Sequence, residues 1–193
     1  MKGLLAAVTA AGSGLLGASL ASHPGSRRFH VLTASVAATW LAGATAAGPV
    51  PRGRREIIQP AAAGAGAFAA FYGCALVARR IPLLRRAITG VLDHAHRGPT
   101  SSVAATALLT GAAEEVFFRG TLYDALGPGG STAAYVLSTT ATRNPALVLA
   151  SAAMGTLFAW QRGRSGGVQA PLLTHVVWSA LMLAFMPRLF PPD

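Results

Sequence analysis

The chain has 193 residues, of which 52% are hydrophobic and only 11% are charged, and its formal net charge is +10. Soluble domains carry about 25% charged residues, so this composition excludes an ordinary water-soluble domain and indicates a protein that crosses a membrane several times. The positive charge does not indicate nucleic-acid binding, because the basic residues form short clusters between apolar stretches, as in loops that touch anionic lipid headgroups.

About seven apolar segments follow one another, most of them near the roughly 20 residues that cross a bilayer as a helix. They are Gly3–Ser22, Phe29–Gly48, Pro60–Ala78, Pro99–Leu126, Ser131–Thr142, Pro145–Trp160 and Val168–Met186. The first also resembles a signal peptide, but its apolar stretch is longer than a typical signal core. The fifth and sixth are short and flank "TRNP", so they are two brief helices or one broken helix. We predict an all-α fold, a polytopic helical bundle that forms one membrane domain over residues 1–193.

A basic amphipathic helix is predicted between the third and fourth segments, in "RRIPLLRRAITGVLDHAHRG". Apolar residues recur there at helical spacing and arginines take the other face, which is typical of a helix that lies on a membrane surface. With seven spans, six basic residues fall on one side of the membrane and nine on the side of this helix. The positive-inside rule then favours the side of this helix as cytoplasmic.

Two adjacent carboxylates lie inside the fourth segment, in "GAAEEVFFRG". Each charge at a helix centre costs about 2.5–3.5 kcal/mol on insertion scales, so both need a reason to be there. Glu115 and Arg119 are four residues apart and can pair on one helix face, which would explain them as a clasp between helices. Glu114 has no partner on its own helix, and a carboxylate in a dry site beside another negative charge is suited to taking and giving protons. This favours a chemical role over a purely structural one.

The motif "EEVFFRG" resembles the EExxxR motif of the CPBP family of intramembrane proteases. This family includes the type II CAAX prenyl endopeptidases and the bacteriocin-processing and immunity proteins of the Abi type. A later block that ends in "PLLTHVVWS" is similar to the family's His-x-x-x-Asn helix. The resemblance covers approximately residues 101–186.

The resemblance implies a role for each residue that matches the family motifs. Glu114 would be the general base that polarises the attacking water, and Glu115 paired with Arg119 would support it. His175 matches the histidine of the last motif, and Ser179 stands where the family has Asn or Asp.

The same resemblance implies a metal or water held partly by a histidine on the intervening helix, in a Phe-x-x-x-His motif. No histidine lies between Arg119 and His175, and the corresponding stretch "YVLSTTATRN" offers only hydroxyls and one amide. A catalytic zinc normally has three protein ligands. Glu114 and His175 supply two and Ser179 would be a weak third, so the expected zinc site has an incomplete ligand set.

His94 and His96 are the histidines nearest in sequence before the carboxylate pair. Either would reach the pair only if the chain reversed abruptly near Pro99, which we do not expect.

The implied function is that of an intramembrane endopeptidase that acts on a prenylated or other membrane-associated peptide or protein. The composition, rich in Ala, Arg and Gly, is typical of GC-rich bacterial genomes, which predicts a multi-pass protein of a bacterial plasma membrane. The missing histidine keeps an alternative open, a catalytically degenerate adaptor or immunity-type protein on the same scaffold. A transporter that relays protons through buried carboxylates is less attractive, because no internal repeat is detectable.

Overall fold

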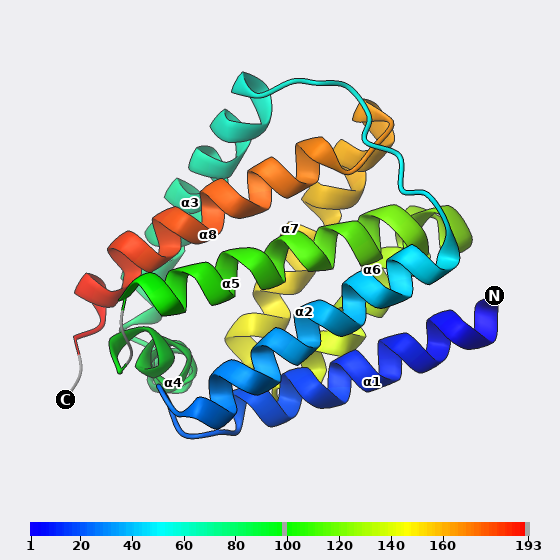
Figure 1. Ribbon diagram of the computed structural model, residues 1–193. Helices are drawn as coiled ribbons and strands as arrows, with labels where there is room; N and C mark the ends of the chain where they lie inside the picture. The colour runs from blue at the N-terminus through cyan, green and yellow to red at the C-terminus, as the bar shows by residue number, and fades with distance from the viewer. Residues whose placement is uncertain (98–99, 192–193) are drawn as a thin grey trace.

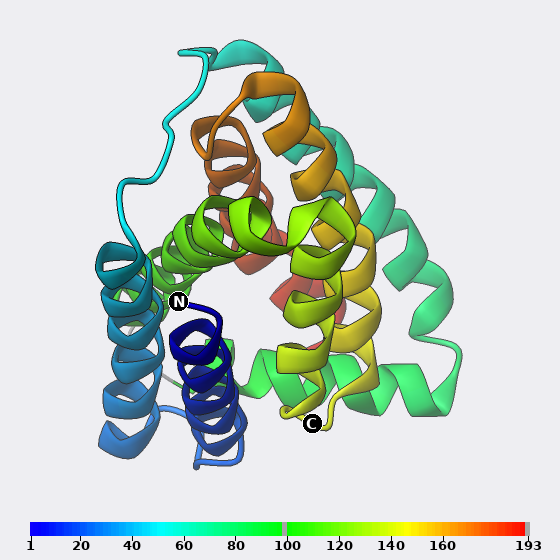
Figure 2. The same cartoon turned by 90° about the vertical axis from the view of Figure 1, so that its right-hand side faces the viewer.

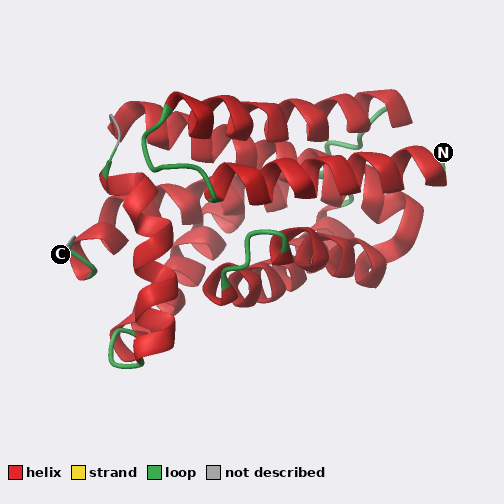
Figure 3. Cartoon of the chain, turned by 90° about the horizontal axis from the view of Figure 1, so that it is seen from below, coloured by secondary structure: helices red, strands yellow, loops and turns green. Residues whose placement is uncertain are grey.

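The structure is a computed structural model that describes residues 1–97 and 100–191. Within these residues the chain forms eight α-helices and one π-helix and contains no strand (Figures 1 and 3), which confirms the predicted all-α class. The helices are α1 (Lys2–Leu20), α2 (Arg27–Ala47), α3 (Ile58–Ala78), α4 (Pro82–His96), α5 (Thr100–Glu114), η1 (Glu115–Leu122), α6 (Tyr123–Thr140), α7 (Pro145–Ser165) and α8 (Gln169–Leu189).

Four helices of the described residues are long and apolar enough to cross a membrane, namely α1, α2, α3 and α8. Backbone groups inside a bilayer must be hydrogen-bonded within the segment, and a helix satisfies this requirement. The chain is thus a multi-pass membrane protein, and the prediction of about seven spans is supported for these four helices. It is not confirmed for α5, which has 15 residues, for α6, which is broken by a kink at Gly127, or for α7, which is not among the four.

The predicted amphipathic helix is α4, which lies across one end of the bundle (Figure 2). Its Leu92 and His94 are buried, while Arg85 and Arg86 are exposed. We call this end of the bundle the α4 end. Two loops meet α4 there: His94 Nε2 lies 3.3 Å from Ser22 O, and the Asn144 side-chain amide donates to Ala87 O at 2.7 Å.

At the opposite end of the bundle, the extended segment 48–57 runs along the turn between α7 and α8. The backbone N–H of Val168 donates to Pro51 O at 3.0 Å, and that of Gln169 donates to Arg52 O at 3.1 Å. The connections between helices therefore gather at two ends, as expected for a chain that crosses a membrane repeatedly.

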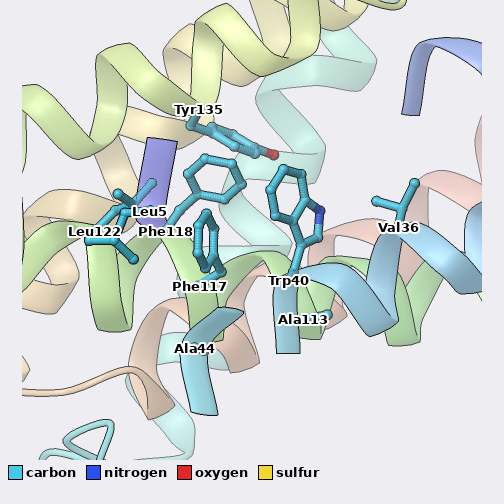
Figure 4. Packing of buried hydrophobic residues seen from close by; sticks show 9 residues of the cluster. All are labelled: Leu5, Val36, Trp40, Ala44, Ala113, Phe117, Phe118, Leu122 and Tyr135. Atoms are coloured by element: carbon cyan, nitrogen blue, oxygen red, sulfur yellow. The ribbon is translucent and has the colours of Figure 1, made fainter. Parts of the chain in front are cut away.

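The main apolar core joins α1, α2, η1 and α6 around Trp40 (Figure 4). The Trp40 ring stacks on Phe117 at 5.0 Å between ring centroids and contacts Phe118 edge-on, also at 5.0 Å. Gly12 of α1 makes room for the indole, because a Cβ at this position would collide with the Trp40 ring. Small residues thus let the helix backbones approach closely, as is usual where helices pack in lipid.

The predicted single segment that ends at Leu126 is not one regular helix. α5 passes directly into the π-helix η1. The kink at Gly127, whose φ of 74° and ψ of 178° are not helical, lies between the predicted fourth and fifth segments. Glycine adopts this left-handed φ without a steric penalty. The short segments around "TRNP" are two separate helices, α6 and α7. The side chain of Asn144 caps α7 by accepting the N–H groups of Ala146 and Leu147.

Candidate active site

Glu115 lies at the centre of a buried ion-pair network. Its Oε1 accepts from Arg119 NH1 at 3.4 Å and lies 2.9 Å from His175 Nδ1. An ionised carboxylate only accepts hydrogen bonds, so Nδ1 is the donor and carries a proton. Both Glu115 and Arg119 are 0% exposed. The expected pair between these two residues is present, and it extends to α8 through His175.

Arg119 is held by two aromatic rings as well as by Glu115. Its guanidinium carbon lies 4.2 Å from the centroid of the Tyr135 ring and 5.2 Å from that of Phe158. Such contacts attract a desolvated cation through the negative face of the ring. Gly155 of α7 permits this packing, because a Cβ there would lie 3.1 Å from Arg119 NH2.

The hydrogen-bond partner of Glu114 lies on a different helix. It is partly exposed, and its Oε2 accepts from the hydroxyl of Tyr135 on α6 at 3.1 Å. The two adjacent carboxylates therefore have different surroundings: one is sealed in an ion-pair network, and the other is hydrogen-bonded on one side and accessible on another.

His175 is positioned by rings and by one small residue. Its imidazole stacks on Phe158 with centroids 4.8 Å apart and an interplanar angle of 19°. Trp178 lies farther along α8, with its ring 5.8 Å from the imidazole. A Cβ on Gly111 of α5 would lie 3.0 Å from His175 Nε2. Glycine at this position therefore lets the imidazole pack closely against α5.

Glu114 and His175 line one cavity of about 230 Å³, which we call the site cavity. It extends from these two residues toward the α4 end, where α1, α2 and α4 form its walls. The lining is mostly apolar, and its other polar side chains are Ser19, Thr33, His94, Thr106 and Thr110. Ser179, one helical turn after His175, does not line the site cavity.

The structure does not contradict the expectation that neither His94 nor His96 reaches the carboxylate pair. His94 Nε2 lies beside Ser22 O, although the His94 side chain lines the site cavity. α4 ends at His96 and α5 begins at Thr100, and α4 crosses the end of the bundle transversely to α5 (Figures 1 and 2). One face of α4 therefore lies against the site cavity, with Val91, Leu92, His94 and Ala95 among its lining residues. His96 points elsewhere, with Nε2 3.4 Å from Pro187 O.

The donor set does not fit a catalytic zinc. Over the described ranges 1–97 and 100–191, no group of three His, Cys, Asp or Glu side chains lies close enough together to hold a metal ion. His175 Nδ1 and Glu115 Oε1 are bonded to each other, and Glu114 is bonded to Tyr135. Catalytic zinc needs three protein ligands, so the mechanism proposed below takes no step through a metal.

The carboxylate pair lies where the α-helical hydrogen-bond pattern changes to the π pattern of η1. Two carbonyls of η1 accept bonds from outside: Phe118 O from the Ser131 hydroxyl at 2.6 Å, and Arg119 O from Arg162 Nε at 2.8 Å. Short π-helical turns inside α-helices frequently occur at functional sites. Here η1 is tied to α6 and α7 at the level of Arg119.

Sequence reasoning missed the residues that surround the charged groups. Tyr135, Phe158, Gly111 and Gly155 touch Glu114, His175 or Arg119. An aromatic or small residue in an Ala-rich apolar segment has no signal that separates a site contact from ordinary packing, so only the arrangement of the helices could identify them.

Residues 96–181 match the model of a protein family described as type II CAAX prenyl endopeptidase Rce1-like. The matched segment contains the carboxylate pair, Arg119 and His175, so the family resemblance seen in the motifs is confirmed there. The search of curated proteins found no match, and neither did the search of solved structures.

Proposed function

We propose that this protein is an intramembrane endopeptidase in which Glu114 activates water for attack on a peptide bond. One observation carries the proposal: Glu114 and His175 line the same cavity, while Glu115 fixes both Arg119 and His175 behind it. The match of residues 96–181 to a family of prenyl endopeptidases supports the same reaction class.

The four groups have separate proposed roles. Glu114 is the base and Arg119 pairs with Glu115. The proposed role of His175 is to donate hydrogen bonds from both ring nitrogens. Its Nδ1–H then donates to Glu115, and its Nε2–H, beside Gly111, is a donor for the oxyanion of a bound substrate.

The reaction then follows in two proton transfers. Glu114 takes a proton from water while the water oxygen bonds to the carbonyl carbon of the scissile peptide. His175 stabilises the negative charge that develops on the carbonyl oxygen. When the C–N bond breaks, Glu114 donates this proton to the leaving nitrogen. General acid–base catalysis of this kind contributes about 10²–10⁴-fold to a rate.

The substrate we propose is a membrane-associated peptide, either prenylated or apolar in itself. The walls of the site cavity are apolar over most of their area and include Leu16, Val103 and Leu183. Such a cavity favours an apolar chain over a charged soluble peptide. The location we propose is a bacterial plasma membrane.

The test is cleavage of a fluorogenic prenylated peptide and of co-expressed membrane proteins by the purified full-length chain. Glu114→Gln keeps the shape and the hydrogen bond from Tyr135 but removes the base. We expect it to lower kcat by about 100-fold or more without changing the unfolding temperature in detergent. Arg119→Ala should lower both kcat and the unfolding temperature, because it removes the arginine that pairs with the buried Glu115 carboxylate.

Two results would contradict the proposal. Equal turnover by Glu114→Gln and the parent would remove Glu114 from catalysis. If a zinc chelator abolished cleavage and added zinc restored it, the metal-free mechanism would be wrong. A folded parent chain that cleaves none of the substrates would favour the alternative, a non-catalytic adaptor.

A further inference from the structure

A second hollow lies outside the site cavity, beside the connection from α3 to α4 and along α4 as far as Asp93. Its volume is about 480 Å³, and we call it the arginine cleft. Four arginines from the two helix ends and their connection surround it, with one acidic side chain. The lining residues are Arg79, Arg80, Pro82, Arg85, Arg86, Thr89, Gly90 and Asp93.

The arginine cleft is suited to an anion. Its four arginines are exposed, and Asp93 is the single carboxylate among its lining residues. No ion pair found within residues 1–97 and 100–191 uses Arg79, Arg80 or Arg86. Arginine presents a planar fork of N–H donors that matches phosphate oxygens in pairs, and the Thr89 hydroxyl adds another donor on the same wall.

The surroundings of the cleft point to a lipid rather than to a dissolved anion. Val77, Ile81 and Leu83 are close in sequence to its lining residues and are 63%, 44% and 68% exposed. Exposed apolar side chains beside cationic heads are typical of a helix at the level of the lipid headgroups, where the apolar face meets acyl chains. α4 lies in this position, across the end of the bundle (Figure 2).

We propose that the arginine cleft binds the phosphate headgroup of an anionic phospholipid. The phosphate would sit among the guanidinium groups, and the acyl chains would lie against Val77, Ile81 and Leu83. The opposite face of α4 carries Leu92 and His94, which line the site cavity. A bound lipid would therefore hold one wall of that cavity in place.

The experiment titrates the full-length protein in neutral detergent with phosphatidylglycerol, or with phosphatidylcholine of the same acyl chains, and counts bound lipids by native mass spectrometry. We expect the parent to bind phosphatidylglycerol more tightly. Arg80→Gln with Arg86→Gln should weaken that binding about 30-fold, because each basic residue near an anionic lipid contributes about fivefold.

The matched control is Arg27→Gln with Arg28→Gln, which removes the same charge from the α4 end but outside the cleft. It should leave lipid binding nearly unchanged. If both double variants weakened lipid binding equally, the lipid would be bound by diffuse surface charge and not by the arginine cleft, and the proposal would be overturned. Displacement of phosphatidylglycerol by inorganic phosphate would show a site for free anions and would overturn it too. None of these readouts depends on peptide cleavage.

Discussion

Tyr135 contacts both of the charged units that form the site. Its hydroxyl donates to Glu114, and its ring lies under the guanidinium of Arg119. The ring also packs against Phe118, with centroids 5.1 Å apart, in the core shown in Figure 4. The two functions of this side chain, hydrogen bonding and packing, can be separated by substitution.

Tyr135→Phe removes the hydroxyl and keeps the ring. A hydrogen bond to a charged group is worth about 1.5–3 kcal/mol, so we expect kcat for peptide cleavage to fall about tenfold as Glu114 loses its orientation. The unfolding temperature in detergent should change little. Tyr135→Ala removes the ring too and should cost a further 3 kcal/mol or so of stability. Equal stability of the two variants would contradict the proposed support of Arg119 by the ring.

At this scale, sequence reasoning identified the charged residues because charge inside an apolar segment is costly and therefore conspicuous. Spacing alone predicted that Glu115 pairs with Arg119, and the structure contains that pair. The bond from Glu115 to His175 spans 60 residues and depends on how α8 packs against η1, which spacing within one helix does not determine. That His94 lines the site cavity depends on how α4 packs across the end of the bundle, which has no signal in helical periodicity.

The helices themselves were largely predictable, because runs of apolar residues of sufficient length must satisfy their backbone groups internally in a membrane. The π-helix η1 was not predictable from the sequence. An α-helix and a π-helix differ in which carbonyl each N–H meets, and the residues "EVFFRG" fit either pattern. The difference lies in the partners from other helices, Ser131 and Arg162, which bond to the carbonyls of η1.

Arg162 is the side chain that ties α7 to η1. Besides the carbonyl of Arg119, it bonds to Asp124 Oδ1 at 2.7 Å and lies 5.0 Å from the Tyr123 ring. Arg162→Ala should lower the free energy of unfolding by about 1–3 kcal/mol, because a buried carbonyl loses its side-chain donor. Thermal unfolding in detergent measures the loss.

Arg164→Ala is the matched control for this prediction. Arg164 lies two residues later on the same helix, is exposed, and packs on the Trp160 ring at 5.3 Å. Its removal should change stability by no more than about 0.5 kcal/mol. If the two variants unfold alike, α7 does not anchor η1 through Arg162.

For the whole molecule, the structure assigns the loops to two ends, and the basic residues divide between them as the sequence predicted. The α4 end carries the larger set, which comprises Arg27, Arg28, Arg79, Arg80, Arg85, Arg86, Arg97, Arg143 and Arg188. The opposite end carries Lys2, Arg52, Arg54, Arg55, Arg162 and Arg164. The arginine cleft and the side of the site cavity nearest to α4 thus share one face of the membrane.

The positive-inside rule then predicts that the α4 end lies in the cytoplasm. Cys74 is the only cysteine of the chain, so Cys74→Ser gives a background without thiols. In this background we would introduce Arg86→Cys at the α4 end or Arg54→Cys at the opposite end. In intact cells a membrane-impermeant maleimide should label the second variant and leave the first unlabelled until the cells are opened. The reverse pattern would place the site cavity's α4 side outside the cell, where a substrate from the cytoplasm could not enter from that side.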